Sequence, residues 1–309
     1  MDEKGYVGLK ITPVQEFWVD CYTTAVYSML LTCNKIDKEY IYNNRYVYFH
    51  DVNEKKNLGR IYIKTRTQEV ADELLTEKEE HDFVSDDHFA ENMKKYIDAG
   101  KTIMLGIDMF YGIEGTSKWH KHHVKHLVIV AGYDDSKKEF AVMETGSTVY
   151  MEFRMSYEDL ERAAKGYNGV SCIYRINSHF SGKMYDLEEI RNNARKIIDS
   201  IDEMEGYIDG IWKAEEDLLL SMGDEIEIHL KSIENRSRAN ALLFEGNLLQ
   251  PIYPDHSGRF KELEKNFKDL KLLFTGSCED GTYYEKEAMI KDRFRELIAV
   301  ERKLWTEIL

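Results

Sequence analysis

The sequence predicts an α+β fold in its first 180 residues and a mostly α-helical region after them. Up to about residue 180, short β-rich runs alternate with helical segments, and beyond that point apolar residues recur at spacings of three and four. The chain has 309 residues, of which 43% are hydrophobic and 32% are charged, with only 3 prolines. This composition is typical of a globular protein, and the length favours two domains, residues 1–180 and 181–309.

Five runs rich in valine, isoleucine, tyrosine and phenylalanine are predicted to be strands of the first domain. They are 59–66, 102–108, 127–135, 139–146 and 149–155. The segment YDDSKKEF joins two of these runs and has the aspartate and serine residues of a tight turn. We therefore expect a hairpin at this point and an antiparallel sheet.

The second domain is expected to be a bundle of about four helices. One apolar stripe runs from Leu187 to Trp212 and predicts a long amphipathic helix, and similar stripes occupy 260–274 and 294–305. Two of the three prolines fall in 246–258, which is therefore expected to be a loop. Exposed parts of these stripes would suit a homodimer surface.

Charge, hydropathy and cysteine content exclude several classes of protein. No secretory signal and no run of about 18 apolar residues is visible, so we expect a cytoplasmic protein without a membrane partner. The formal net charge of -15 and the lack of a dense basic patch argue against nucleic acid as a partner. The cysteines form no C-x-x-C pair and are expected to be free thiols. They are Cys21, Cys33, Cys172 and Cys278.

Cys21 stands at the predicted start of a helix, in the stretch VQEFWVDCYTTAVYSML (14–30). The unpaired N–H groups and the positive dipole end of a helix N-terminus favour a thiolate, so this position suits a cysteine nucleophile. Gln15, six residues upstream, is placed to donate its side-chain amide to a developing oxyanion, beside the backbone N–H of Cys21. The alternative is a packing role for a small thiol.

The candidate general base lies in WHKHHVKHLVIVAGYDD. If this segment forms a strand, His126 adjoins its most apolar part and is held inside the fold, whereas the histidines of 120–123 belong to a loop or to the mouth of the site. Glu144, in the next predicted strand, is expected to accept the imidazole N–H, with Asp108 as a second possible orienting group. Clustered histidines could instead bind a metal, but no H-E-x-x-H or paired-cysteine spacing accompanies them, so we expect neither a metal nor a cofactor.

Two parts of the sequence resemble known families. Residues 15–29 resemble the Q-x(4)-D-C-x(3)-A opening of papain-like bacterial cysteine peptidases that cut bacteriocin leader peptides, and residues 126–144 resemble their histidine strand, turn and acidic residue. The stretch AGKTIMLGIDMFYGIEG…HHVKHLVIVAGYDD is similar to the N-terminal domain of the butirosin biosynthesis protein H family, whose members are papain-like acyltransferases. Tyr22 stands where the peptidases usually have glycine, and Glu144 where they usually have aspartate.

The resemblance implies a papain-like cysteine peptidase fold, in which the helix bearing the cysteine packs on an antiparallel sheet, followed by a helical C-terminal domain. It implies that the catalytic residues are Cys21, His126, Glu144 and Gln15. The residues expected to line the substrate site beside them are Asp20, Tyr22 and Asp108.

The activity that this resemblance implies is acyl transfer beside nonribosomal peptide or polyketide machinery. Cys21 would take an acyl group from the thioester of an acyl- or peptidyl-carrier protein, and a small-molecule amine or hydroxyl would accept it. Docking of an acidic carrier protein would depend on the basic residues of 259–271. The alternatives are a papain-like peptidase or amidase, in which water is the acceptor, and a non-catalytic scaffold protein.

Overall fold

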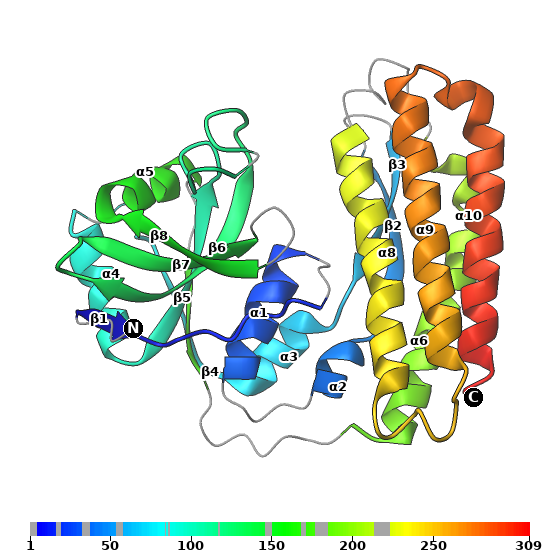
Figure 1. Ribbon diagram of the computed structural model, residues 1–309, viewed down its shortest axis with the longest axis horizontal. Coiled ribbons are helices and arrows are strands. Elements are labelled where there is room, and N and C mark those ends of the chain that lie inside the picture. The colour runs from blue at the N-terminus through cyan, green and yellow to red at the C-terminus, as the bar shows by residue number, and fades with distance from the viewer. Residues whose placement is uncertain are drawn as a thin grey trace. The chain divides into compact units, whose positions relative to one another are not determined.

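The computed structural model describes residues 5–16, 20–32, 38–53, 58–83, 85, 87–116, 118–145, 150–167, 171–176, 185–212 and 223–309. The chain divides into two compact units (Figure 1). The first consists of residues 1–15, 20–36 and 67–182, and the second of residues 16–19, 37–66 and 183–309. The domain boundary predicted near residue 180 falls within 177–184, which lie outside the described residues.

The first unit is built on a seven-stranded sheet whose described pairings are all antiparallel. The strand order is β4-β9-β5-β6-β7-β8, and β1 pairs with β6. The strands are β1 Tyr6–Gly8, β4 Leu75–His81, β5 Lys101–Asp108, β6 Lys125–Asp134, β7 Glu139–Thr145, β8 Tyr150–Ser156 and β9 Ser171–Ile176. This sheet and its helices confirm the predicted α+β class.

Four of the predicted strands correspond to β5, β6, β7 and β8. The Asp134 carboxylate closes the turn between β6 and β7, because it accepts hydrogen bonds from the backbone N–H of Ser136 at 2.9 Å and from its hydroxyl at 2.6 Å. The predicted hairpin is therefore confirmed. The sequence pattern does not predict β4 or β9. β4 contains three glutamates and one lysine among its seven residues, a composition that suits its position at the edge of the sheet.

Helices cover the sheet of the first unit. In the described part of this unit they are α1 Cys21–Thr32, α3 Thr67–Leu74, α4 Phe89–Asp98 and α5 Tyr157–Tyr167. The core combines Ile103, Leu105 and Ile107 of β5 with Phe89 of α4 and Leu160 of α5, all almost fully buried. Every side chain of α1 from residue 23 to residue 30 is buried, so this helix is held firmly against the unit that contains the sheet.

The second unit is mainly helical, as predicted. Its long helices are α6 Leu187–Glu205, α8 Gly223–Glu245, α9 His256–Glu279 and α10 Tyr283–Thr306, and its shorter elements are α2 Lys38–Tyr42, the 3-10 helix η1 Ile208–Gly210, and the strands β2 Val47–Asn53 and β3 Leu58–Lys64. None of the helices in the described part of the chain has the length and apolar character that a membrane span requires.

The strand predicted at 59–66 as part of the first domain belongs elsewhere. β3 pairs with β2 in a separate two-stranded sheet, and both strands lie in the second unit. Ile61 and Ile63 point their side chains into the core of that unit, where β2 packs on α6 and β3 on α8. The alternation of apolar residues shows that one face of a strand is buried, but it does not show which partner buries it.

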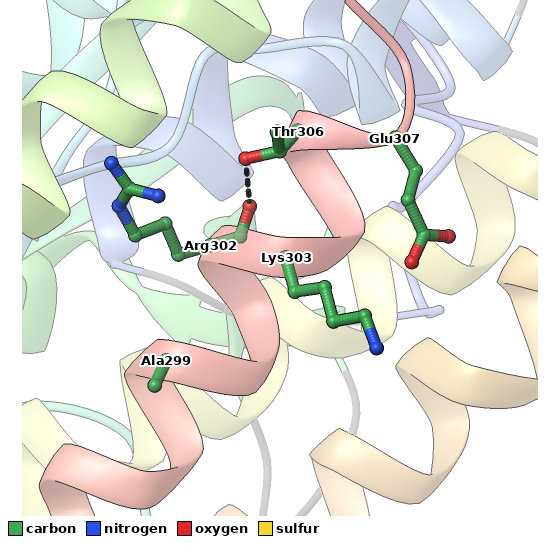
Figure 2. Close-up of a pocket in the computed structure, with 5 residues that line it drawn as sticks. All are labelled: Ala299, Arg302, Lys303, Thr306 and Glu307. Atoms are coloured by element: carbon green, nitrogen blue, oxygen red, sulfur yellow. Dashed lines mark hydrogen bonds between the residues drawn. The ribbon is translucent and has the colours of Figure 1, made fainter.

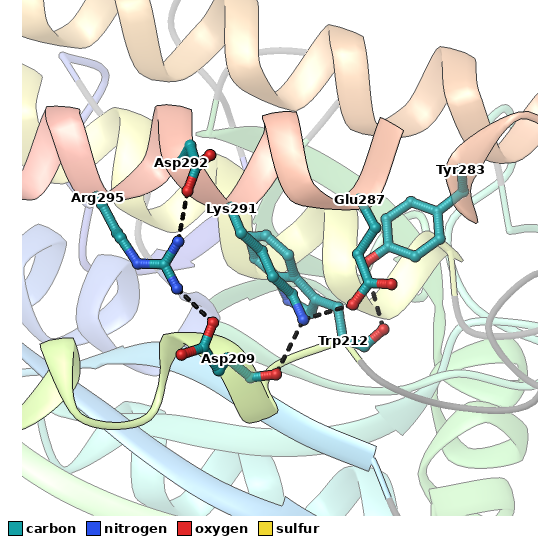
Figure 3. A network of polar contacts seen from close by, with 7 residues as sticks. All are labelled: Asp209, Trp212, Tyr283, Glu287, Lys291, Asp292 and Arg295. Carbon is teal, nitrogen blue, oxygen red and sulfur yellow. Dashed lines mark hydrogen bonds and ion pairs between the residues drawn. The ribbon is translucent and has the colours of Figure 1, made fainter. Parts of the chain in front are cut away.

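The helix predicted from Leu187 to Trp212 ends at Glu205, where Gly206 follows, and glycine supports a helix poorly. After Gly206, Tyr207 is exposed, but Ile208, Ile211 and Trp212 are still buried. Figure 3 shows how α10 holds this segment. Lys291 donates to the Asp209 carbonyl oxygen at 3.1 Å, Arg295 pairs with the Asp209 carboxylate, and the Tyr283 hydroxyl donates to the Trp212 carbonyl oxygen at 3.3 Å.

Candidate active site

Cys21 is the first residue of α1, and Asp20 caps this helix. The Asp20 carboxylate accepts hydrogen bonds from the backbone N–H and from the hydroxyl of Thr23, both at 2.7 Å. An aspartate at this position satisfies N–H groups that have no partner within the helix, which fixes where the helix begins. Asp20 was expected to line the substrate site, and in the structure it caps α1. In this position its negative charge lies beside Cys21.

The Cys21 thiol is half-buried, and its environment opposes ionisation. Burial, followed by the negative charge of Asp20, raises the pKa of the thiol to about 11, although the backbone N–H of Leu127 donates to the sulfur and lowers it. The position of Cys21 at a helix N-terminus predicts the opposite effect, a lowered pKa of the thiol. Desolvation outweighs the helix dipole here, so the resting thiol is protonated at neutral pH.

His126 and Glu144 meet on neighbouring strands of the sheet. Nε2 of His126 lies 2.7 Å from Oε2 of Glu144, and their side chains are 19% and 2% exposed. His126 precedes Leu127, whose N–H reaches the Cys21 sulfur, and the charge of Glu144 acts on the same thiol. The structure therefore brings His126 and Glu144 together, and it places Glu144 and the backbone of the residue after His126 near Cys21. Their catalytic role remains a prediction.

Asp108, the other candidate to orient His126, contacts a different histidine. Its Oδ2 lies 2.7 Å from Nδ1 of His123. In the sheet, Ile107 pairs with His126 and Asp108 pairs with Lys125. Because successive side chains of a strand point to opposite faces, Asp108 is out of phase with His126. Burial raises the pKa of Asp108, but the hydrogen bonds from His123 and from the backbone of Phe110 hold it below its ordinary value.

The histidines of 120–123 lie in the loop between β5 and β6 with exposed side chains, as predicted. His123 stacks on Phe110, with ring centroids 4.3 Å apart. His120 lines a cavity of about 200 Å³ together with aromatic and arginine side chains, among them Trp119 and Arg162. Within the described residues, the structure brings no three histidine, cysteine, aspartate or glutamate side chains together as a metal site.

Gln15 is exposed, in an extended segment that runs back along α1. The backbone N–H groups of Thr12 and Val14 donate to the hydroxyls of Thr32 and Ser28, at 2.9 and 3.1 Å. From Thr12 to Val14 the hydrogen-bond partner moves back along α1 by four residues, which is about one turn. The segment therefore runs antiparallel to α1, and Gln15 lies closer than Thr12 to the end of the helix that carries Cys21. Residues 17–19, which complete the connection, lie outside the described residues.

Tyr22 directs its hydroxyl toward α3 and β9. The hydroxyl donates to Oε1 of Gln68 at 2.7 Å, and it also makes a hydrogen bond with Tyr174. These contacts anchor the side chain that occupies the place of the usual glycine.

Two features near Cys21 are not predicted from the sequence. One is the backbone N–H of Leu127, which no residue pattern can reveal because every non-proline residue has this group. The other is Tyr150 at the start of β8, a buried tyrosine that lies within electrostatic range of both Glu144 and Cys21. It is one of 20 tyrosines in the chain, and no spacing distinguishes it from the others.

The remaining cysteines and the cavity on the second unit are weaker candidates for a catalytic site. Cys172 is half-buried and Cys278 is buried, and Cys33 lies outside the described residues. A depression of about 520 Å³ follows the last turns of α10 (Figure 2). Its lining residues are Ala299, Arg302, Lys303, Thr306 and Glu307, which include no nucleophile of the kind found at Cys21.

Comparison with known proteins agrees with the geometry of the first unit. The sequence matches the Peptidase_C39-like family over residues 14–172, a span that contains Gln15, Cys21, His126 and Glu144. No curated protein matches the sequence. The matched span is slightly more than half of the 309 residues. The chain therefore belongs to the Peptidase_C39-like family, which is of the papain-like cysteine peptidase type.

Proposed function

We propose that this protein is a cysteine-dependent acyltransferase, in which Cys21 carries the acyl group between donor and acceptor. The main support is the 2.7 Å contact between Nε2 of His126 and Oε2 of Glu144. It lies next to Leu127, whose backbone N–H donates to the Cys21 sulfur. A nucleophile, a base and a group that orients the base are the components that nucleophilic acyl chemistry requires.

The first half of the reaction loads Cys21. Because Nε2 of His126 faces Glu144, Nδ1 is the ring nitrogen that remains to take the thiol proton. As the proton moves to His126, the sulfur attacks the carbonyl carbon of the donor thioester. The donor carbon–sulfur bond then breaks, and the departing thiolate takes the proton back from the imidazolium. The raised pKa of Cys21 requires this proton transfer to accompany the attack, since almost no thiolate is present beforehand.

The second half returns the enzyme to its starting state. The acceptor amine or hydroxyl loses a proton to His126 as it attacks the carbonyl carbon held on Cys21. The carbon–sulfur bond of the acyl-enzyme breaks, and the Cys21 thiolate recovers the proton from His126.

Burial of the catalytic groups supports transfer over hydrolysis. Glu144 is 2% exposed and His126 is 19% exposed, and burial is the main cause of the high pKa of Cys21. A site with little water favours an acceptor that binds specifically. A peptidase or amidase activity is the second candidate, because the chain belongs to a family of the cysteine peptidase type.

A carrier-protein thioester is the donor that the resemblance to the butirosin biosynthesis protein H family supports. α9 carries five of the basic residues expected to dock a carrier protein, and acidic side chains of the same unit neutralise part of this charge. Three of them are ion-paired, Arg259 with Glu307, Lys261 with Glu245, and Lys271 with Glu234. These ion pairs weaken the support that charge gives to docking, so a small or peptidyl thioester is the simpler first substrate to test.

The test is to incubate the full-length protein with acyl thioesters of N-acetylcysteamine and to measure its intact mass, followed by peptide mapping. Cys21→Ala removes the proposed nucleophile, and Cys172→Ala is a matched control, because Cys172 is also a half-buried free thiol of the first unit. We expect one acyl group on the wild type and on Cys172→Ala, and none on Cys21→Ala.

Addition of a primary amine then separates the two candidate functions. Appearance of the amide supports the acyltransferase, whereas release of the free acid alone supports the hydrolase. A wild-type protein that gains no acyl group, or that gains it equally without Cys21, would refute both.

A further inference from the structure

A cavity of the first unit lies between the loop that joins β5 to β6, the end of β8 and the start of α5. Its volume is about 200 Å³, below the range of about 300–1,000 Å³ that is typical of sites for drug-sized ligands. It therefore suits a ligand of about the size of one amino acid. The side chains that matter for recognition are Tyr111, Glu114, Trp119, His120, Asp159 and Arg162.

The part of this cavity formed by β8 is separate from the candidate active site. In the pairing of β7 with β8, Glu144 stands opposite Met151, whereas residues 154–156, which line the cavity, stand opposite residues 139–141. These positions are three to five residues away from Glu144 along β7, which corresponds to about 10–17 Å along the strand. The cavity is thus a candidate binding site in addition to the one at Cys21.

One wall of the cavity is a pair of stacked rings in a constrained loop. His120 has a φ of 52°, in the left-handed region that residues other than glycine rarely adopt, and its N–H donates to the Phe110 carbonyl oxygen at 3.1 Å. The His120 and Trp119 rings stack with centroids 4.4 Å apart and planes 23° apart. Strained backbone of this kind is concentrated at functional sites, where the surrounding structure holds it in place.

Side chains of both charges line the same cavity. Arg162 pairs with Asp159 at 3.5 Å, a long contact between side chains that are 60% and 53% exposed, so its guanidinium remains available to a carboxylate. Glu114 has no hydrogen-bond or ion-pair partner among the residues that the structure describes, so its carboxylate is available to an ammonium group. The guanidinium of Arg154 is engaged with Glu152 at 2.7 Å.

We propose that this cavity binds a free amino acid as its zwitterion. Arg162 binds the α-carboxylate and Glu114 binds the ammonium group, while the side chain of the ligand packs on the rings of Trp119 and His120. The two carboxylates of the lining would repel a purely anionic ligand, and Arg162 would repel a purely cationic one. A zwitterion satisfies both charges. This site does not depend on the acyl chemistry proposed for Cys21.

The test is isothermal titration calorimetry of the full-length protein with each standard amino acid in turn, at ligand concentrations into the millimolar range. An amino acid that binds is then compared with its α-amide, which lacks the carboxylate, and with its N-acetyl derivative, which lacks the ammonium group. The variants are Trp119→Ala, Arg162→Ala and Lys165→Ala. Lys165 is the matched control, an exposed cation of α5 that pairs with Glu161 at 2.6 Å outside the lining of the cavity.

We expect one amino acid or more to bind with one-to-one stoichiometry, and both derivatives to bind about tenfold more weakly or worse. Arg162→Ala should weaken binding of the amino acid by about tenfold but leave the affinity for its amide unchanged, because the amide has no carboxylate for Arg162 to bind. Trp119→Ala should weaken both ligands, and Lys165→Ala should retain the wild-type affinity.

Three results would overturn the proposal. The first is that no amino acid binds, and the second is that the derivatives bind as tightly as the parent amino acid. The third is that Arg162→Ala weakens the amino acid and its amide equally or weakens neither, because Arg162 would then not be the group that recognises the carboxylate.

Discussion

At the scale of single residues, the reactivity of Cys21 is set by opposing effects. The helix N-terminus and the N–H of Leu127 favour the thiolate, while burial and the negative charges of Asp20 and Glu144 favour the thiol. The sequence reveals the first effect, because a helix start can be read from residue types. It does not reveal burial, which depends on what the rest of the unit packs against the residue.

Asp20→Asn tests this balance. Asparagine is as good a helix cap as aspartate, so α1 should remain, but the negative charge beside the sulfur is lost. The pKa of Cys21 should fall from about 11, and alkylation of Cys21 by iodoacetamide at pH 8 should accelerate roughly threefold to tenfold. In the wild type, the same rate should keep rising as the pH is raised toward 11, because only the thiolate reacts.

Asp159→Asn is the matched control, since Asp159 lies in the first turn of α5 in the same unit. It should leave the alkylation of Cys21 unchanged. Equal rates for Asp20→Asn and the wild type at pH 8 would show that Asp20 does not control the thiol.

At the scale of elements, strand phase determines which partners can meet. The alternation of side chains separates His126 from the histidines of the loop, and this much could be predicted from the sequence. The partner of Asp108 could not, because it depends on register: Asp108 pairs opposite Lys125, one position away from the residue opposite His126. The same limit applies to β3, whose apolar alternation is visible while its pairing with β2 is not.

A buried ion pair joins elements of the second unit. Arg236 of α8 pairs with Glu301 of α10, and both side chains are completely buried. The guanidinium lies 4.0 Å from the ring centroid of Tyr48, whose hydroxyl donates to Glu301 at 2.8 Å. Removing one partner of a buried pair leaves the other charge without compensation, which is more costly than the net contribution of the pair.

Arg236→Leu should therefore lower the free energy of unfolding of the second unit by about 3–5 kcal/mol. Chemical denaturation followed by tryptophan fluorescence measures this change. Arg302→Leu breaks the exposed pair of Arg302 with Asp202 and should have a much smaller effect. A similar, small loss for both variants would contradict the importance assigned to the buried pair.

At the scale of the whole molecule, the fold class could be predicted from the sequence, but the assignment of every segment to one of the two units could not. The change from β-rich runs to long apolar stripes indicates a sheet-containing unit followed by helices, which the structure confirms. The paired strands β2 and β3 belong to the second unit although they precede most of the first unit in sequence. The sequence does not reveal this, because the two strands have the same residue pattern whichever unit buries their apolar face.

The proposed acyl chemistry of the first unit depends on Cys21 as the nucleophile and on His126 as its base. The most direct test is the rate at which an acyl N-acetylcysteamine thioester acylates Cys21 in the wild type, in His126→Ala and in His123→Ala. His123 is the matched control, a nearby histidine that also contacts a carboxylate. We expect His126→Ala to slow acylation by about 100-fold or more, while the rate of His123→Ala stays close to that of the wild type. Equal acylation rates for His126→Ala and the wild type would contradict this proposal.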